Sequence, residues 1–147
     1  MEKKFKLSYS DFDPITRVSI ARIETKIGTF VGTAFLQDKD KDNPSKFFGC
    51  QLAEYKAIRN YYIALVKRLK LEAHGMKQIC DAIDTSIKVT NKNDLLPAAK
   101  IAKRNYNKKL REIKIIEQKI RDVKCYIDYN IKVRDEYLKK KQKDKIK

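Results

Sequence analysis

The chain has 147 residues, of which 42% are hydrophobic and 10% aromatic, so it has enough apolar content for one folded domain and is not a disordered tail. Its 35 lysines and arginines outnumber its 19 aspartates and glutamates, and the formal net charge of +16 predicts a surface that attracts phosphates. Only eight of the 35 basic residues are arginines, the residue type suited to bidentate phosphate contacts, and the rest are lysines. A solvated lysine surface therefore explains the charge equally well.

The cysteines and the apolar runs predict a cytoplasmic protein. Cys50, Cys80 and Cys125 are odd in number and widely spaced, which fits neither a disulfide framework nor a zinc site. Residues 1–7 alternate charged and apolar side chains and lack the apolar core of a signal peptide. No apolar run approaches the roughly 20 residues that a membrane-spanning helix needs. We therefore expect no membrane partner and no bound metal.

The first third of the chain predicts an antiparallel sheet. Gly32 lies in the middle of an expected strand, where glycine predicts a bulge or a close approach of another backbone. The polar residues 38–45 predict a surface loop. Three segments carry alternating or β-branched side chains and are the expected strands of a meander within residues 1–50: residues 4–9, 16–25 and 29–36.

From residue 51 the apolar spacing changes to three and four, which is typical of helices. The spacing predicts a helix over residues 51–74 that ends at His74-Gly75, and a shorter helix over residues 76–87. These helices form a helical region over residues 51–90. The stretch 89–94 is rich in turn and capping residues and predicts a loop.

Residues 94–145 predict a single long helix. Pro97 fits its first turn, and no glycine or proline follows before residue 140. About 44 helical residues would be on the order of 65 Å long, roughly twice the length of the helix expected over residues 51–74. A second chain should therefore cover the rest of the apolar stripe, as a homo-oligomer. The stripe comprises Ile113, Ile116, Ile120, Val123, Ile127, Ile131 and Leu138.

The expected fold class is therefore α+β. A single domain, residues 1–147, begins with an antiparallel β-meander, and a helix, a short helix and a long oligomerising C-terminal helix follow.

Basic residues recur on one face of the long helix. Lys100, Arg104, Lys108 and Arg111 are spaced by four, four and three, so they form one stripe. Residues 98–147 contain 18 basic and seven acidic side chains, so this segment carries most of the net charge. The stripe is either a phosphate-binding ridge or the solvated face that any amphipathic helix requires.

Three other cations are candidate contacts for an anionic ligand, and each also has a structural explanation. Arg59 interrupts the apolar face of the first helix between Tyr55 and Tyr62, where a guanidinium binds an anion or pairs with an acidic neighbour. Arg22 and Lys26 share a sheet face, which is either part of an anionic-ligand pocket or solvated.

The sequence predicts no catalysis. His74 is the sole histidine and lies at an expected helix end, where capping explains it. No nucleophile and base set is indicated, and the four glycines form no nucleotide-binding fingerprint. We therefore expect neither an enzyme nor a bound cofactor.

Three stretches carry a resemblance: residues 28–34 (GTFVGTA), the charged loop at 38–44 and residues 47–54 (FFGCQLAE). With the order of sheet and helices, they resemble the Thoeris anti-defence protein 1 family. These phage proteins are sponges that sequester glycocyclic ADP-ribose signals made by bacterial TIR-domain enzymes, and some members also bind cyclic oligonucleotide signals.

The resemblance implies dimers assembled into hexamers in the host bacterial cytoplasm, with ligand sites between protomers. It also implies a small anionic cyclic nucleotide as the ligand, which is held without cleavage. The residues that match by topology are Arg22, Lys26, Arg59, Asn91, Asn93, Arg104, Lys108 and Arg111.

Two other classes of function fit the same charge and helix length. A basic phage protein could lay its long helices along a duplex or RNA and would need no pocket. A virion or scaffold component would use the long helix for assembly alone.

Overall fold

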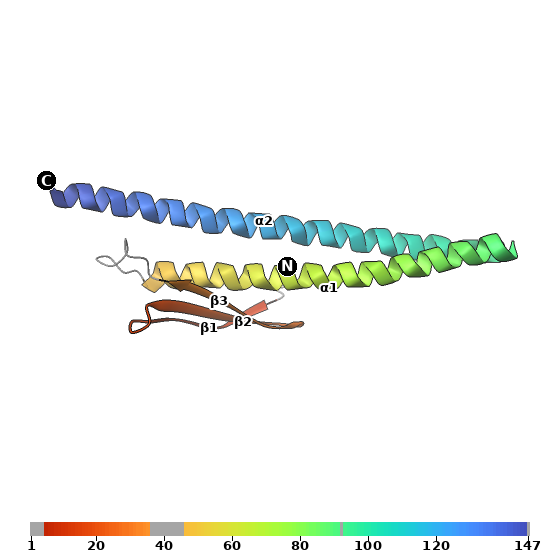
Figure 1. The fold of residues 1–147 in the computed structure, drawn as a ribbon, viewed down its shortest axis with the longest axis horizontal. Coiled ribbons are helices and arrows are strands. Elements are labelled where there is room, and N and C mark those ends of the chain that lie inside the picture. Colours follow the sequence, from red (N-terminus) through yellow and green to blue (C-terminus); the bar gives the residue numbers. More distant parts are fainter. Residues whose placement is uncertain (1–4, 36–45, 92, 147) are drawn as a thin grey trace. The chain divides into compact units, whose positions relative to one another are not determined.

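The computed structural model describes residues 5–35, 46–91 and 93–146 (Figure 1). An antiparallel sheet precedes two long helices, so the α+β class with an N-terminal meander is confirmed. The expected loop at 38–45 lies outside the described residues. The elements are β1 (Phe5–Asp13), β2 (Val18–Thr25), β3 (Gly28–Phe35), α1 (Lys46–Thr90), a 3-10 turn η2 (Asn93–Leu95) and α2 (Leu96–Ile146).

The chain divides into two compact units, and both helices contribute to each. Unit 1 comprises Met1–Tyr62 with Ile120–Lys147, and therefore contains the sheet, the first part of α1 and the last part of α2. Unit 2 comprises Ile63–Lys119, which is the remainder of the two helices and their connection.

The sheet has the order β1-β2-β3, and both pairings are antiparallel. A register shift lies between Leu7 and Tyr9, so Ser8 forms a bulge and its hydroxyl donates to the carbonyl of Arg22 at 3.1 Å. Beyond the bulge, alternate residues of β1 change face. Alternate residues of β2 are buried and exposed, and Gly32 of β3 lies against α1, so the sheet presents one face to α1 and the other to solvent.

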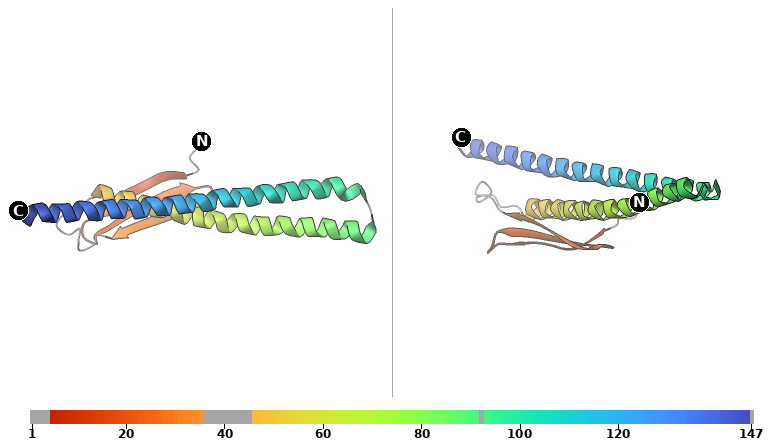
Figure 2. Two further views of the ribbon diagram at one scale, coloured as in Figure 1. Left: turned by 90° about the horizontal axis from the view of Figure 1, so that it is seen from above. Right: turned by 45° about the vertical axis from the view of Figure 1, so that its right-hand side comes forward.

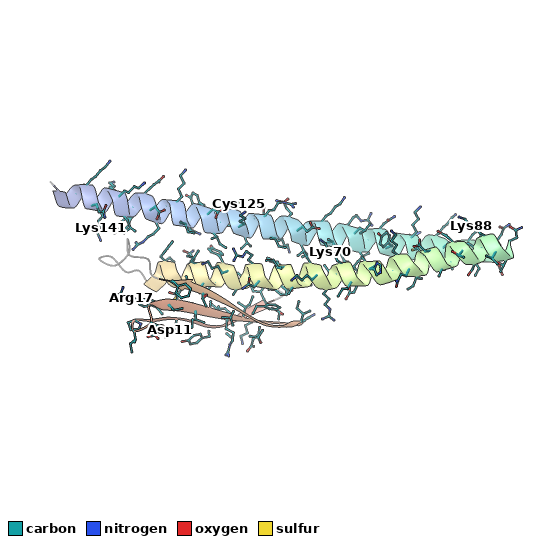
Figure 3. All side chains as sticks on the ribbon, in the orientation of Figure 1. Asp11, Arg17, Lys70, Lys88, Cys125 and Lys141 are labelled. Atoms are coloured by element: carbon teal, nitrogen blue, oxygen red, sulfur yellow. The ribbon has the colours of Figure 1, made fainter. Side chains whose placement is uncertain are left out.

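Asp13 closes the turn between β1 and β2. Its carboxylate accepts hydrogen bonds from the Ile15 amide at 2.9 Å and the Thr16 hydroxyl at 2.8 Å, and these two donors hold its pKa below the usual value. Arg17 ends the turn with a φ of 60° and donates its amide to the Asp13 carbonyl at 2.8 Å (Figure 3). Side-chain and backbone bonds together define this connection.

Small side chains bring α1 very close to the sheet. A Cβ on Gly32 of β3 would overlap the Ala53 carbonyl oxygen and the Ala57 amide nitrogen, and a Cβ on Gly49 would overlap the Ser19 hydroxyl. Gly49, Ala53 and Ala57 recur every four residues and therefore lie on one face of α1. The expectation from Gly32 is confirmed as a close backbone approach.

In unit 1, α2 packs on the side of α1 that faces away from the sheet (Figure 1). Leu52 of α1 and Ile127 of α2 belong to one buried cluster with sheet residues. The rings of Tyr55 and Tyr126 stack with their centroids 6.0 Å apart, and the Arg134 guanidinium lies 5.6 Å from the centroid of Phe48. Unit 1 therefore has three layers: sheet, α1 and α2.

In unit 2 the two helix segments run antiparallel and pack against each other (Figure 2). Ala73 of α1 and Ile113 of α2 are each 5% exposed. The Lys109 ammonium pairs with the Glu72 carboxylate on the other helix at 3.0 Å. This bond raises the pKa of Lys109 and lowers that of Glu72.

The expected helix end at His74-Gly75 is wrong, because α1 is continuous over 45 residues. A glycine inside a helix costs only about 1 kcal/mol relative to alanine, and burial of the neighbouring Ala73 offsets this cost. The helix ends instead at Thr90, and the next residue, Asn91, has a φ of 55° and donates its amide to the Ile87 carbonyl at 2.8 Å. As expected, Pro97 lies in the first turn of α2.

A second chain is expected only if the first helix is short, and this premise is wrong. The α1 helix has 45 residues and α2 has 51, so α1 is long enough to accompany α2. All seven apolar residues of the expected stripe, from Ile113 to Leu138, are buried or half-buried within the single chain. Oligomerisation therefore remains a prediction that the apolar stripe does not support.

We predict opposite effects for two glycine-to-alanine substitutions. Gly32→Ala should lower the free energy of unfolding by about 2 kcal/mol or more, because the new methyl group meets the α1 backbone. Gly75→Ala should raise it by about 0.5–1 kcal/mol, because a Cβ there meets nothing within 4 Å and alanine favours the helix. Urea denaturation measures both, and a neutral Gly32→Ala would contradict the close packing.

Candidate functional site

A cationic hollow of unit 2 lies on one exposed face of α2. We call it the cationic face. Its residues follow helical spacing, so their side chains emerge within about a third of the helix circumference. They surround a shallow hollow of about 340 Å³. The lining residues are Lys100, Lys103, Arg104, Asn107 and Arg111.

The cations of this face have no counter-ion among the described residues. The carboxylates of Glu72 and Glu112 pair with Lys109, at 3.0 and 3.4 Å, and Glu72 also lies 3.6 Å from the Arg68 guanidinium. These acids therefore neutralise charge elsewhere in unit 2. Four positive side chains converge around Asn107 and remain available to an anion.

The structure places three of the four residues of the expected stripe around this hollow. Arg104 and Arg111 lie together with Lys100, whereas Lys108 is exposed and does not line the hollow. Lys103 and Asn107 line it although the sequence analysis did not select them. Their positions, three and seven residues after Lys100, were a signal for the same helix face.

Asn91 and Asn93 lie at the connection between α1 and α2. Asn91 adopts the left-handed conformation that ends α1, and Asn93 begins the 3-10 turn, with both side chains exposed. Backbone geometry accounts for asparagine at residue 91, because asparagine tolerates positive φ. Neither residue lines the cationic face.

The three candidates of unit 1 do not converge. Arg22 is exposed on the solvent face of the sheet, where its Nε donates to the Ser8 hydroxyl at 3.1 Å. Lys26 is exposed in the turn between β2 and β3. Arg59 is half-buried on α1, four residues after Tyr55, on the helix face that carries the contact with α2. The sheet lies between Arg22 and α1, so these residues form no common pocket.

Arg59 has a cationic neighbour in Lys56. Burial lowers the pKa of Lys56, and the positive charge of Arg59 lowers it further. No ion pair to either side chain is present among the residues that the structure describes. The internal ion pair, one of the two alternatives for Arg59, is therefore not found in this part of the chain, and two like charges share a half-buried position.

A second hollow lies between the two helices of unit 2, and we call it the interhelix groove. It has a volume of about 420 Å³. Lys70, His74 and Lys77 line it from α1, and Tyr106 and Lys114 are among the residues that line it from α2. His74 is therefore not a helix cap. A helix end at Gly75 would leave no such groove, although residues 70, 74 and 77 have helical spacing and were a signal for one face.

Several chemical features are lacking from the described residues. No group of three or more histidine, cysteine or acidic side chains is placed to hold a metal ion. No helix has the length and apolar content to cross a membrane. The three cysteines are free thiols, of which Cys125 is exposed (Figure 3).

Comparison with known proteins adds no relative. No family model, no curated protein and no solved structure matches the chain.

We predict that Lys56→Met stabilises the protein at neutral pH by about 0.5 kcal/mol, because it removes a partly desolvated charge beside Arg59 and keeps the apolar stem. Because the pKa of Lys56 is lowered in the folded state, its charged form destabilises the wild-type protein fully at pH 7. This destabilisation fades as the pH rises toward the ordinary lysine pKa of 10.5, where Lys56 is increasingly neutral. The gain should therefore shrink at alkaline pH.

Thermal unfolding between pH 7 and 10 measures this difference. The control is Lys67→Met, because Lys67 is an exposed lysine of the same helix and should show no such gain. A clear loss of stability in Lys56→Met would instead indicate that Lys56 has a counter-charge in solution.

Proposed function

We propose that this protein binds and sequesters a small anionic cyclic nucleotide, without cleaving it, through the cationic face of α2. The observation that carries the proposal is the convergence of Arg104 and Arg111 with two lysines around Asn107, with no counter-ion among the described residues. A sponge of this kind needs affinity and no chemistry. It would act in the cytoplasm of a bacterial host.

The side chains of this face suit a ligand with two phosphates. Arg104 and Arg111 are separated by seven residues, or about 10 Å along the helix axis, so each can contact a different phosphate. A guanidinium binds phosphate through two parallel hydrogen bonds, and flanking lysines add charge. The Asn107 amide both donates and accepts, as a ribose hydroxyl or base edge requires.

The resemblance to the anti-defence family supplies the class of ligand. Residues 28–34 coincide with β3 and residues 47–54 with the start of α1. These stretches contain Gly32, Gly49 and Ala53, whose close contacts join the sheet to the helix. The resemblance therefore bears on packing in unit 1, and the support for phosphate binding comes from α2 itself. In a homo-oligomer, a neighbouring subunit would close the shallow hollow.

Nucleic-acid binding is the second candidate. The cations from Lys100 to Arg111 follow an open helix face for about three turns, which also suits the regularly spaced phosphates of a duplex. The two candidates differ in salt dependence, because binding along a duplex releases many counter-ions and weakens steeply with salt.

The test is thermal unfolding of the full-length protein with cyclic ADP-ribose isomers, cyclic trinucleotides and duplex DNA, each at low and high salt. A rise of several degrees with one cyclic nucleotide that persists at high salt is expected. Sedimentation of the same samples measures the oligomeric state, and chromatography of denatured complexes should recover intact ligand. Stabilisation by DNA alone, with a steep salt dependence, would replace this proposal with the second candidate.

We predict that the double substitution Arg104→Glu with Arg111→Glu weakens nucleotide binding about tenfold or more, because it removes both guanidinium contacts. The matched control is Lys124→Glu with Lys132→Glu, two exposed positions of α2 with the same change in net charge. Titration calorimetry of both variants shows whether binding is lost through the two local contacts or through the change in net charge. Equal losses in the two would exclude the cationic face as the site.

A further inference from the structure

The interhelix groove of unit 2 has an apolar floor. Ala73 and Ile113 are each 5% exposed, and Leu110 and Tyr106 are half-buried beside them. Ala73 has the shortest side chain among these four, and all four line the hollow. An apolar group that enters the groove is removed from water by side chains of both helices.

The rim of the groove is cationic. Lys70 and Lys77 on α1 and Lys114 on α2 are exposed, and within the described chain none of them forms an ion pair. Glu117 is the one acidic residue among the lining residues. His74 is exposed between the two α1 lysines, with its Nε2 3.3 Å from the Gln78 side-chain nitrogen. The rim therefore favours an anion over a neutral or cationic ligand.

The groove differs in chemistry from the cationic face. Tyr106, Leu110 and Ile113 lie on the side of α2 that contacts α1, whereas Arg104 and Arg111 lie on a solvent face and surround no apolar floor. A ligand of the groove must therefore combine an apolar body with a charged head. The groove is thus a separate candidate site, and it does not depend on the proposed function.

We propose that the interhelix groove binds a medium-chain carboxylate, with the alkyl chain on the floor and the carboxylate among the rim lysines. The α1 residues that line the groove, from Lys70 to Lys77, span about 10 Å along the helix axis, which an extended chain of about eight to ten carbons matches. Each methylene buried on the floor should tighten binding roughly fourfold until the groove is full.

Titration calorimetry on the full-length protein tests this assignment with octanoate and decanoate, below their micelle concentrations. Decanol and decyltrimethylammonium serve as neutral and cationic probes of the same chain length. Decanoate should bind about tenfold or more tightly than octanoate, and at least about tenfold more tightly than the other two probes. Equal binding of the three ten-carbon probes, or no decanoate binding at millimolar concentration, would overturn the proposal.

Two kinds of variant locate the binding. Lys77→Glu and Lys114→Glu should each weaken decanoate about fivefold or more, whereas the control Lys67→Glu changes the same charge on α1 outside the groove and should have little effect. Ala73→Leu should fill the floor and abolish the advantage of decanoate over octanoate. Circular dichroism checks that Ala73→Leu is folded, and the lysine variants decide the question if it is not. Equal decanoate affinity in Lys77→Glu, Lys114→Glu and Lys67→Glu would contradict the assignment.

Discussion

The close approach of β3 to α1 is the constraint on which the rest of unit 1 depends. Gly32 leaves no side chain between the strand and the helix, and the face formed by Gly49, Ala53 and Ala57 meets the sheet through backbone and methyl groups. The larger side chain of Tyr55 lies on another face of α1 and stacks on Tyr126 of α2, whereas Leu52 packs with both sheet residues and Ile127 of α2. The strip of small residues thus determines which face of α1 contacts the sheet and leaves the opposite face to α2.

Unit 2 has a different balance of forces because it consists of two helix segments. Each segment of such a hairpin buries one stripe, and most of its surface remains in water. The excess of lysine and arginine lies on that surface, where Lys109 is neutralised by Glu72 and Glu112. Two groups of the remaining cations line hollows: one on the exposed face of α2 around Arg104, and one on the rim of the groove between the helices.

Local patterns predicted the fold well where local geometry decides it. Alternation located the three strands within a few residues, and the absence of glycine and proline after Pro97 predicted one long helix. The helix end predicted at Gly75 is wrong, because glycine ends a helix only where tertiary contacts do not stabilise the helical turn that contains it. That error shortened the first helix by half and produced the inference that a second chain must cover α2.

The sequence by itself determined that Arg104 and Arg111 share a helix face, because the helical repeat relates residues seven apart whatever they pack against. It also determined the excess of positive charge, and it left a bulge or a close backbone approach as the two alternatives at Gly32, which the structure resolves as a close approach. Only the tertiary structure decided that Arg22 lies on the face of the sheet away from α1, which separates it from Arg59, and that His74 faces a groove. Those relations join residues far apart in the chain, and they depend on which side of each element is buried, which a single helix or strand does not specify.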